Sequence, residues 1–207
     1  LILFLSAFVF CFSLKAQKFQ DKKAFDNGER LTYKVRYNLY FNINVGEIEF
    51  KINSKDKKLK GTDCYHVSVK GRTYGFYDNF YKVRDTYETL MEEETLLPRI
   101  YLREVNEGKY SFTEKAVFHH DKNYLTNKDD KKIEIPDNTR DILSAIYLAR
   151  MIDYNSMNYG DSVMMNLFID DKVYHVGFKY KGKEKIKTKF GKQTCLKIQP
   201  ILIVGNI

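Results

Sequence analysis

A strict alternation of apolar and polar residues runs through most of the chain and restricts its fold more than any other feature. Between residues 31 and 39 every second residue is apolar and each residue between them is polar. A period of two is the signature of a β-strand with one face in a core. The same pattern returns in seven further segments: Ile48–Ile52, Tyr65–Val69, Phe80–Leu90, Ile100–Val105, Tyr110–His119, Val163–Ile169 and Tyr174–Tyr180.

Short polar stretches separate these segments. The expected turns are Asn42–Asn44, Asn106–Gly108, Asp170–Asp171 and Gly182–Lys183. Connections of this length join antiparallel neighbours, because parallel strands need a long crossover. We therefore expect a mainly β fold, either an antiparallel β-barrel or an open half-barrel or meander.

One segment departs from the period of two. Apolar residues recur there at helical spacing, at Ile142, Ala145, Ile146, Ala149 and Ile152. Asn138 is the expected N-cap, and Asp141 would lie in the first turn. We predict a single α-helix from residue 139 to about residue 152.

The N-terminal run Leu1–Leu14 carries no charge. It is shorter than the ~20 apolar residues that span a bilayer, and it fits the core of a signal peptide ending near Ala16. We therefore expect a signal peptide over residues 1–16, its start missing, and a single β-rich domain over residues 17–207. The mature chain should have no transmembrane segment. The apolar run Ile201–Val204 so near the last residue leads us to expect a truncated C-terminus.

Basic residues outnumber acidic ones by 35 to 27, a net charge of +8. For an exported protein this charge favours anionic polymers or lipid head groups as partners and not nucleic acid. Lysines alternate along one predicted hairpin, and alternation can bring them to one face that attracts anionic lipid or glycolipid. The alternative is a solvated face that discourages strand-edge aggregation. The lysines are Lys179, Lys181, Lys183, Lys185, Lys187 and Lys189.

Asp85 lies in the inward phase of its strand, together with Tyr81 and Tyr87. A buried carboxylate needs a charged or hydrogen-bonded partner. Arg84 and Arg103 are near in sequence, and we expect the partner to be Arg103 or a tyrosine hydroxyl. Two interpretations remain open: Asp85, Arg84 and Arg103 anchor a ligand, or Asp85 belongs to a structural ion pair.

Known catalytic patterns are missing from the sequence. The four histidines lack metal-ligand spacing, and no nucleophile elbow, phosphate loop or dinucleotide glycine pattern occurs. We therefore expect no enzyme activity, no cofactor and no metal. Cys64 and Cys195 would remain in the mature chain, where one disulfide is possible; we expect the two thiols to stay free.

Four elements of the sequence occur in a familiar order. They are Gly28–Tyr33, Tyr81–Asp85 with Leu97 and Pro98, Glu107–Tyr110, and Asp141–Ala145 with Arg150. From about Phe25 to the end, the chain resembles the exported bacterial proteins grouped as domain of unknown function 3108. The resemblance implies a Gram-negative cell-envelope protein and brings no catalytic residues. Members usually continue with a further strand pair, which implies truncation here.

Two classes of function agree with these observations. The first is a non-catalytic periplasmic binding or carrier module for an amphiphilic or anionic envelope ligand, such as a lipid or glycolipid, acting at the periphery of the outer membrane. The second is a structural or assembly protein of the envelope that binds protein or polysaccharide. An apolar cavity would favour the first class, and a solid core with an exposed aromatic patch the second.

Overall fold

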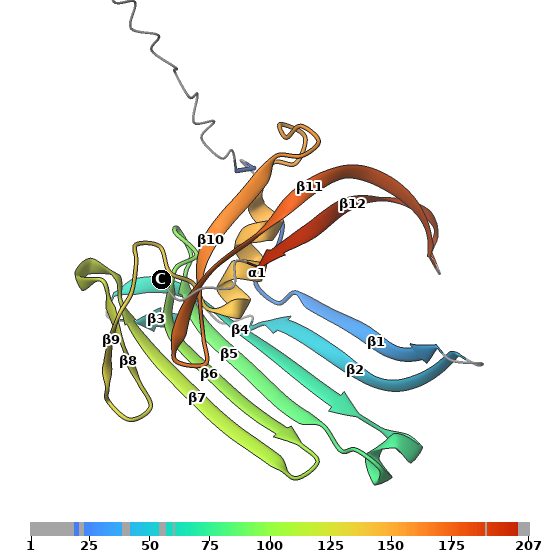
Figure 1. Ribbon diagram of the computed structural model, residues 1–207, viewed down its shortest axis with the longest axis horizontal. Coiled ribbons are helices and arrows are strands. Elements are labelled where there is room, and N and C mark those ends of the chain that lie inside the picture. The colour runs from blue at the N-terminus through green and yellow to red at the C-terminus, as the bar shows by residue number, and fades with distance from the viewer. Residues whose placement is uncertain are drawn as a thin grey trace, which may run out of the picture.

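A computed structural model describes residues 19–20, 23–38, 42–53, 57–59, 61–188 and 190–202. Two antiparallel sheets and one α-helix make up the described part (Figure 1). Within these residues the sheets do not close into a barrel, so the fold is the open alternative of the two that we expected. The predicted signal peptide over residues 1–16, Lys189 and residues 203–207 lie outside the described residues.

The larger sheet is a meander, in which almost every strand pairs with its neighbour in sequence. All its strand pairs are antiparallel, as the short turns predict. β3 (Lys57–Leu59) pairs only with β4, beside the main path. The strands on that path are β1 (Arg30–Asn38), β2 (Asn42–Ile52), β4 (Thr62–Thr73), β5 (Arg84–Glu92), β6 (Pro98–Glu107), β7 (Tyr110–His119), β8 (Tyr124–Asn127) and β9 (Lys132–Glu134).

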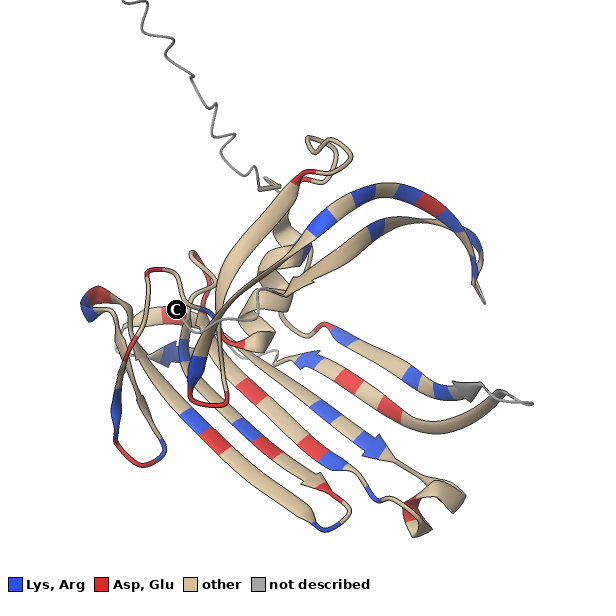
Figure 2. Cartoon of the chain, in the orientation of Figure 1, with Lys and Arg blue, Asp and Glu red and all other residues tan. Residues whose placement is uncertain are grey.

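The two faces of this sheet differ in charge, because alternate residues point to opposite sides. The outer face carries cross-strand ion pairs, and Figure 2 shows the charged bands along the strands. Glu47 on β2 lies 2.7 Å from Lys34 on β1 and 2.6 Å from Arg72 on β4. The inner face of β2 carries Phe50 and Ile52, which join the core.

The smaller sheet contains β10 (Ser162–Ile169), β11 (Lys172–Thr188) and β12 (Gly191–Leu202). The turn at residues 170–171 is confirmed, since Ile169 pairs with Lys172. The predicted hairpin turn at Gly182–Lys183 is wrong, because β11 continues through it to Thr188. Gly182, with a φ of +83°, lies where the β11–β12 register shifts, so this glycine permits a β-bulge and not a turn.

The predicted helix exists as α1 (Ile142–Met151) but starts later than expected. Asn138 has a φ of +57° and does not cap the helix. Arg140 is extended: its N–H donates to the carbonyl of Asn166, and its carbonyl accepts from the N–H of Phe168, both at 2.8 Å. Because both backbone groups of Arg140 are hydrogen-bonded to β10, the helix starts after this residue, and Asp141 is its N-cap.

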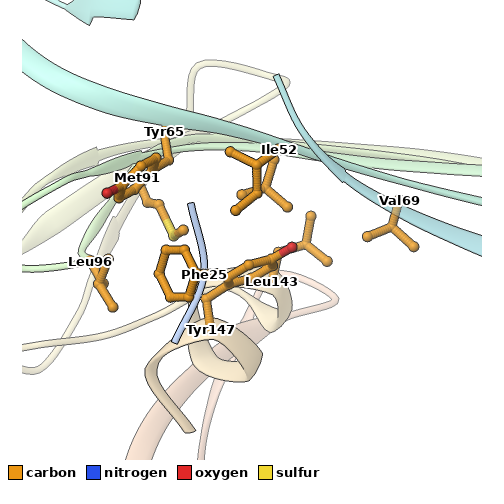
Figure 3. Close-up of a cluster of buried hydrophobic side chains, with 9 residues drawn as sticks. Phe25, Ile52, Tyr65, Val69, Met91, Leu96, Leu143 and Tyr147 are labelled. Atoms are coloured by element: carbon orange, nitrogen blue, oxygen red, sulfur yellow. The ribbon is translucent and has the colours of Figure 1, made fainter. Parts of the chain in front are cut away.

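Helix α1 packs on the inner face of the larger sheet through the main core cluster (Figure 3). Phe25 lies between the two layers, with its ring 4.8 Å from that of Tyr147 on the helix and 5.4 Å from that of Tyr65 on β4. Met91 and Leu143 complete the contact and are almost fully buried. No bilayer-spanning helix is found in the described part of the chain.

The cap residue Asp141 also connects the helix to the sheet. Its carboxylate accepts the N–H groups of Leu143 and Ser144, at 2.7 and 2.9 Å, and the hydroxyl of Thr89 on β5, at 2.6 Å. Asp141 has no exposed surface. Because burial disfavours the charged form, the pKa of Asp141 rises from 3.8 to about 6 despite these hydrogen bonds.

This pKa predicts how stability depends on pH. Between about pH 4 and pH 6 the folded state holds a proton on Asp141 that the unfolded state loses, so the stability from this group falls as pH rises. Each pKa unit corresponds to about 1.4 kcal/mol, so the total loss is about 3 kcal/mol. Asp141→Asn keeps a cap oxygen but does not titrate. In urea unfolding, the free energy of unfolding of the variant should therefore rise relative to that of the wild type between about pH 4 and about pH 7. A difference between the two proteins that stays constant over this pH range would contradict the prediction.

Candidate binding site

Asp85 is half-buried on the inner face, but its hydrogen-bond partner is neither Arg103 nor a tyrosine hydroxyl, the two partners predicted from the sequence. Its Oδ1 accepts the backbone N–H of Asn106 at 2.9 Å. Arg103 lies opposite Tyr87 in the β5–β6 register, two residues along the strand from Asp85. Burial raises the pKa of Asp85, and the hydrogen bond from Asn106 opposes this rise. The backbone amide of Asn106 on the neighbouring strand β6 is therefore the hydrogen-bond partner that the Asp85 carboxylate requires.

Arg103 joins three elements of the fold. Its Nη1 lies 2.7 Å from Asp170 in the β10–β11 turn and 3.5 Å from Glu114 on β7. The guanidinium also lies over the rings of Tyr87 and Phe112, at 5.7 and 5.3 Å. Glu114 is only 3% exposed, and burial raises its pKa. Arg103 thus holds the smaller sheet against the larger one.

Arg84 points to the other side of the sheet. It binds Asp78 in the 3-10 helix η1 (Gly75–Asn79) with contacts of 2.5 and 3.1 Å, and it also donates to the carbonyl of Thr73 at 3.0 Å. The pKa of Asp78 falls to about 2, chiefly because of the hydrogen bond from Arg84. The fold therefore does not bring Arg84, Asp85 and Arg103 together in one site.

The prediction that alternation brings the lysine series to one face is wrong. The bulge at Gly182 inserts one residue into β11, so the side chains that follow it change sides. Lys179 pairs with Gln199 before the bulge and lies on one face. Lys183, Lys185 and Lys187, which follow the bulge, lie on the other face with Leu196. Lys181 falls within the bulge and lies over the ring of Tyr159, at 4.8 Å.

The two cysteines of the described region are free. Cys64 is buried on β4, whereas Cys195 lies on β12 in the other sheet. In the same part of the chain, no group of three His, Cys, Asp or Glu side chains is placed to hold a metal ion.

A cavity of about 390 Å³ lies between the segment that precedes β1, the β5–β6 turn and α1. Much of its wall is apolar, and the remainder carries charged and polar groups. The apolar residues are Phe19, Phe25, Leu96, Leu148 and Met151. The polar and charged residues are Gln20, Lys23, Glu93, Glu94, Thr95 and Arg140.

Arg140 is the most buried charge of this cavity wall, with 7% of its surface exposed. Its guanidinium donates to the carbonyls of Leu96 and Thr95, the latter at 3.2 Å. Burial lowers the pKa of Arg140 to about 10, so the side chain is still a cation at neutral pH. Among the described residues, no ion pair joins it to a carboxylate.

The turn that accepts these hydrogen bonds is itself strained. Leu96 has a φ of +54°, a conformation that costs an L-residue on the order of 1–2 kcal/mol. Burial of the Leu96 side chain in the main core and the hydrogen bond from Arg140 to its carbonyl offset this cost. The local strain therefore serves to direct two carbonyls at one buried guanidinium.

Lys23 supplies the second cation of the cavity. Its Nζ donates to the hydroxyl of Tyr65 at 2.5 Å and lies 3.8 Å from Glu93. Glu93 thus offsets the charge of Lys23, and Glu94 is exposed. Arg140 is left as the cation whose hydrogen-bond partners are neutral carbonyls, beside an apolar wall, although the carboxylate of Asp141 also acts on its charge. This combination suits an amphiphile with a carboxylate or phosphate head group.

Sequence analysis did not single out Arg140 or Lys23. The signal near Arg140 was the helix start, which we assigned to Asn138 instead of Asp141. Alternation shows which face a strand residue takes, but it does not show that residues 93–96 lie beside Phe19, Lys23 and Phe25. The cavity therefore follows only from the tertiary structure.

The fold and the cavity define an open antiparallel β protein, with a pocket where its helix meets the sheet. The chain belongs to the family described as protein of unknown function (DUF3108), which matches residues 32–205. This match confirms the family resemblance seen in the sequence. No curated protein and no solved structure matches the chain.

The Arg103 contacts lead to a second prediction. Arg103→Met should lower the free energy of unfolding by about 3–5 kcal/mol, because it leaves Glu114 buried without a countercharge. Adding Glu114→Gln removes that charge and keeps an oxygen for the N–H of Asp171, which donates to Glu114 at 3.2 Å. Denaturant unfolding should show the double variant recovering at least about 1 kcal/mol. A double variant no more stable than Arg103→Met would refute this account.

Proposed function

We propose that the protein is a non-catalytic binding or carrier module of the cell envelope, and that it holds an amphiphilic molecule with an anionic head group. The observation that carries the proposal is Arg140, a buried cation in the wall of a largely apolar pocket, which donates to neutral carbonyls and forms no ion pair among the described residues. The head group would meet the guanidinium, and the acyl part would lie against Phe25, Leu96 and Met151.

The size and chemistry of the pocket support this proposal. Pockets for small molecules usually measure about 300–1,000 Å³ and combine apolar walls with a few polar groups. A volume of about 390 Å³ suits a single acyl chain better than a whole two-chain lipid. A planar guanidinium can also bind carboxylate or phosphate with two parallel hydrogen bonds, which gives it specificity for such head groups.

The proposed compartment is the periplasm. The uncharged run Leu1–Leu14 followed by Ala16 supports export, and the net charge of +8 suits an anionic envelope. Sequencing the N-terminus of the protein recovered from cells should find it starting near Gln17. Recovery of residues 1–16 on a cytosolic protein would contradict this part of the proposal.

One observation favours the alternative, an assembly protein that binds another protein. β1 and β12 lie at the ends of their sheets in the described part of the chain, and each can accept an added strand. Native mass spectrometry of the protein isolated from the periplasm separates the two functions. A bound amphiphile supports the binding module, whereas a bound polypeptide without an amphiphile supports assembly.

Filling the pocket should weaken ligand binding without unfolding the protein. Leu148→Trp places a larger side chain in the wall, and Ile146→Trp, 39% exposed on the same helix, is the matched control. Isothermal titration with lysophosphatidylglycerol should give at least about tenfold weaker binding for Leu148→Trp and an unchanged affinity for Ile146→Trp. Equal binding by both variants would exclude this pocket as the site.

Arg140 should determine the preference for an anionic head group. The wild type should bind lysophosphatidylglycerol more tightly than an uncharged monoacylglycerol, by about tenfold or more, because hydrogen bonds to charged groups are worth roughly 1.5–3 kcal/mol. In Arg140→Met this preference should vanish while monoacylglycerol binding persists. Circular dichroism identifies the folded fraction, and a preference that survives in the folded variant would rule out this role for Arg140.

A further inference from the structure

Two neighbouring turns at one end of the larger sheet expose aromatic side chains. The first is the β4–β5 connection, which contains η1, and the second is the β6–β7 turn; both lie at the far end of the sheet from α1 (Figure 1). Phe76 and Phe80 are 69% and 70% exposed, and Tyr81 and Tyr110 are 53% and 58% exposed. We call these four residues the aromatic tip.

Two sets of contacts order the rings of the aromatic tip. The ring centroids of Phe76 and Phe80 are 4.6 Å apart. Tyr81 packs on the β6–β7 turn, where a Cβ added to Gly108 would come within 3.1 Å of its ring. The hydroxyl of Tyr81 donates to Glu107 at 3.3 Å. Tyr81 therefore packs the β4–β5 connection against the β6–β7 turn, and both turns carry exposed aromatic side chains at the same end of the sheet.

Hydrogen bonds brace the loop that carries these rings. Arg84 on β5 binds Asp78, and the Thr73 hydroxyl donates to Asp78 at 2.6 Å. The same hydroxyl accepts the N–H of Val83 at 3.0 Å, which closes the base of the loop. The hydrogen bonds of this loop keep two phenyl rings exposed to water, which is unfavourable for apolar groups. Such a loop gives a partner a preformed apolar contact, with little ordering left to do on binding.

We propose that the aromatic tip inserts into the surface of a lipid bilayer that contains anionic lipids. Phe76 and Phe80 would enter the boundary between head groups and acyl chains, and Tyr81 and Tyr110 would lie at head-group level, where aromatic residues with a polar end are favoured. Exposed lysines flank the rings at positions 82 and 109 and would meet lipid phosphates.

The size and shape of the aromatic tip favour a bilayer over a folded protein. A stable protein interface buries about 800 Å² on each side and draws on roughly 20–30 residues. The aromatic tip has four large side chains at the ends of two turns, so a flat surface can reach them without touching the rest of the sheet. Lipid binding needs only a few inserted rings and adjacent positive charge.

This inference goes beyond the pocket and does not rest on it. None of the residues of the aromatic tip lines the cavity beside Arg140. Binding of a dispersed single-chain amphiphile tests the pocket, and binding to vesicles tests the aromatic tip. Failure of one proposal is thus distinguishable from failure of the other.

Tryptophan fluorescence provides a direct test, because the sequence contains no tryptophan. Phe80→Trp places a reporter in the aromatic tip, and Tyr159→Trp, at a position 71% exposed in the loop after α1, is the matched control. Vesicles of phosphatidylcholine and phosphatidylglycerol should shift the Phe80→Trp emission to the blue, and lipids with brominated chains should quench it. The control emission should not change. An unshifted, unquenched Phe80→Trp emission would overturn the proposal.

Vesicle co-sedimentation of the whole protein measures the contribution of each group. Phe76→Ser/Phe80→Ser should lower the partition coefficient by about tenfold for each ring, and Tyr159→Ser should leave it unchanged. Lys82→Gln/Lys109→Gln should weaken binding to anionic vesicles by about fivefold for each lysine, and binding to pure phosphatidylcholine much less.

Two results of this assay would contradict the proposal. The first is equal vesicle binding by the wild type and the Phe76→Ser/Phe80→Ser variant. The second is loss of a polypeptide partner from that variant with its vesicle binding intact, which would assign the aromatic tip to a protein interface.

Discussion

Two consecutive residues, Arg140 and Asp141, connect all the layers of the structure. The backbone of Arg140 pairs with β10, and its side chain binds the β5–β6 turn. Asp141 starts the helix and binds Thr89 on β5. Because the two sheets do not form one closed barrel in the described part, their relation depends on such links. These hydrogen bonds add to the core contacts of Phe25, Leu143 and Tyr147 in positioning α1 on the larger sheet.

Two buried cations perform different tasks in this arrangement. Arg103 has carboxylate partners in Asp170 and Glu114, so its charge is compensated within the protein. Arg140 has carbonyl partners, which satisfy its hydrogen bonds but leave its net charge in place. The neighbouring carboxylate of Asp141 acts on Arg140 through space, but among the described residues no carboxylate forms an ion pair with it. Its guanidinium can therefore bind an anionic ligand directly. This difference makes the pocket wall, and not the Arg103 cluster, the better candidate for binding.

The sequence predicted the kind of fold better than the site. Alternation identified most of the long strands and the Asp170–Asp171 turn, because burial of one face imposes a period of two. It did not find the short strands β3, β8 and β9, and it began β5 at Phe80 and not at Arg84. It missed the bulge at Gly182, since one inserted residue leaves the composition of the segment unchanged while it reverses the faces that follow. It also assigned Arg103 to Asp85, a neighbour in sequence, whereas the actual partner Asp170 lies 67 residues away. Which side chains pair between the two sheets depends on tertiary packing, and the alternation of apolar and polar residues carries no information about that packing.

The order of the strands has a consequence for the way the chain folds. Nearly every strand pairs with its sequence neighbour, so both sheets can grow by successive closure of short hairpins. The contact of Phe25 with Tyr147 and the pairing of Arg150 with Glu29, 121 residues apart, close far longer loops. Loop closure costs more entropy as the loop lengthens. The pocket is therefore built from the contacts that are most distant in sequence, whereas each sheet is built almost entirely from local hairpins.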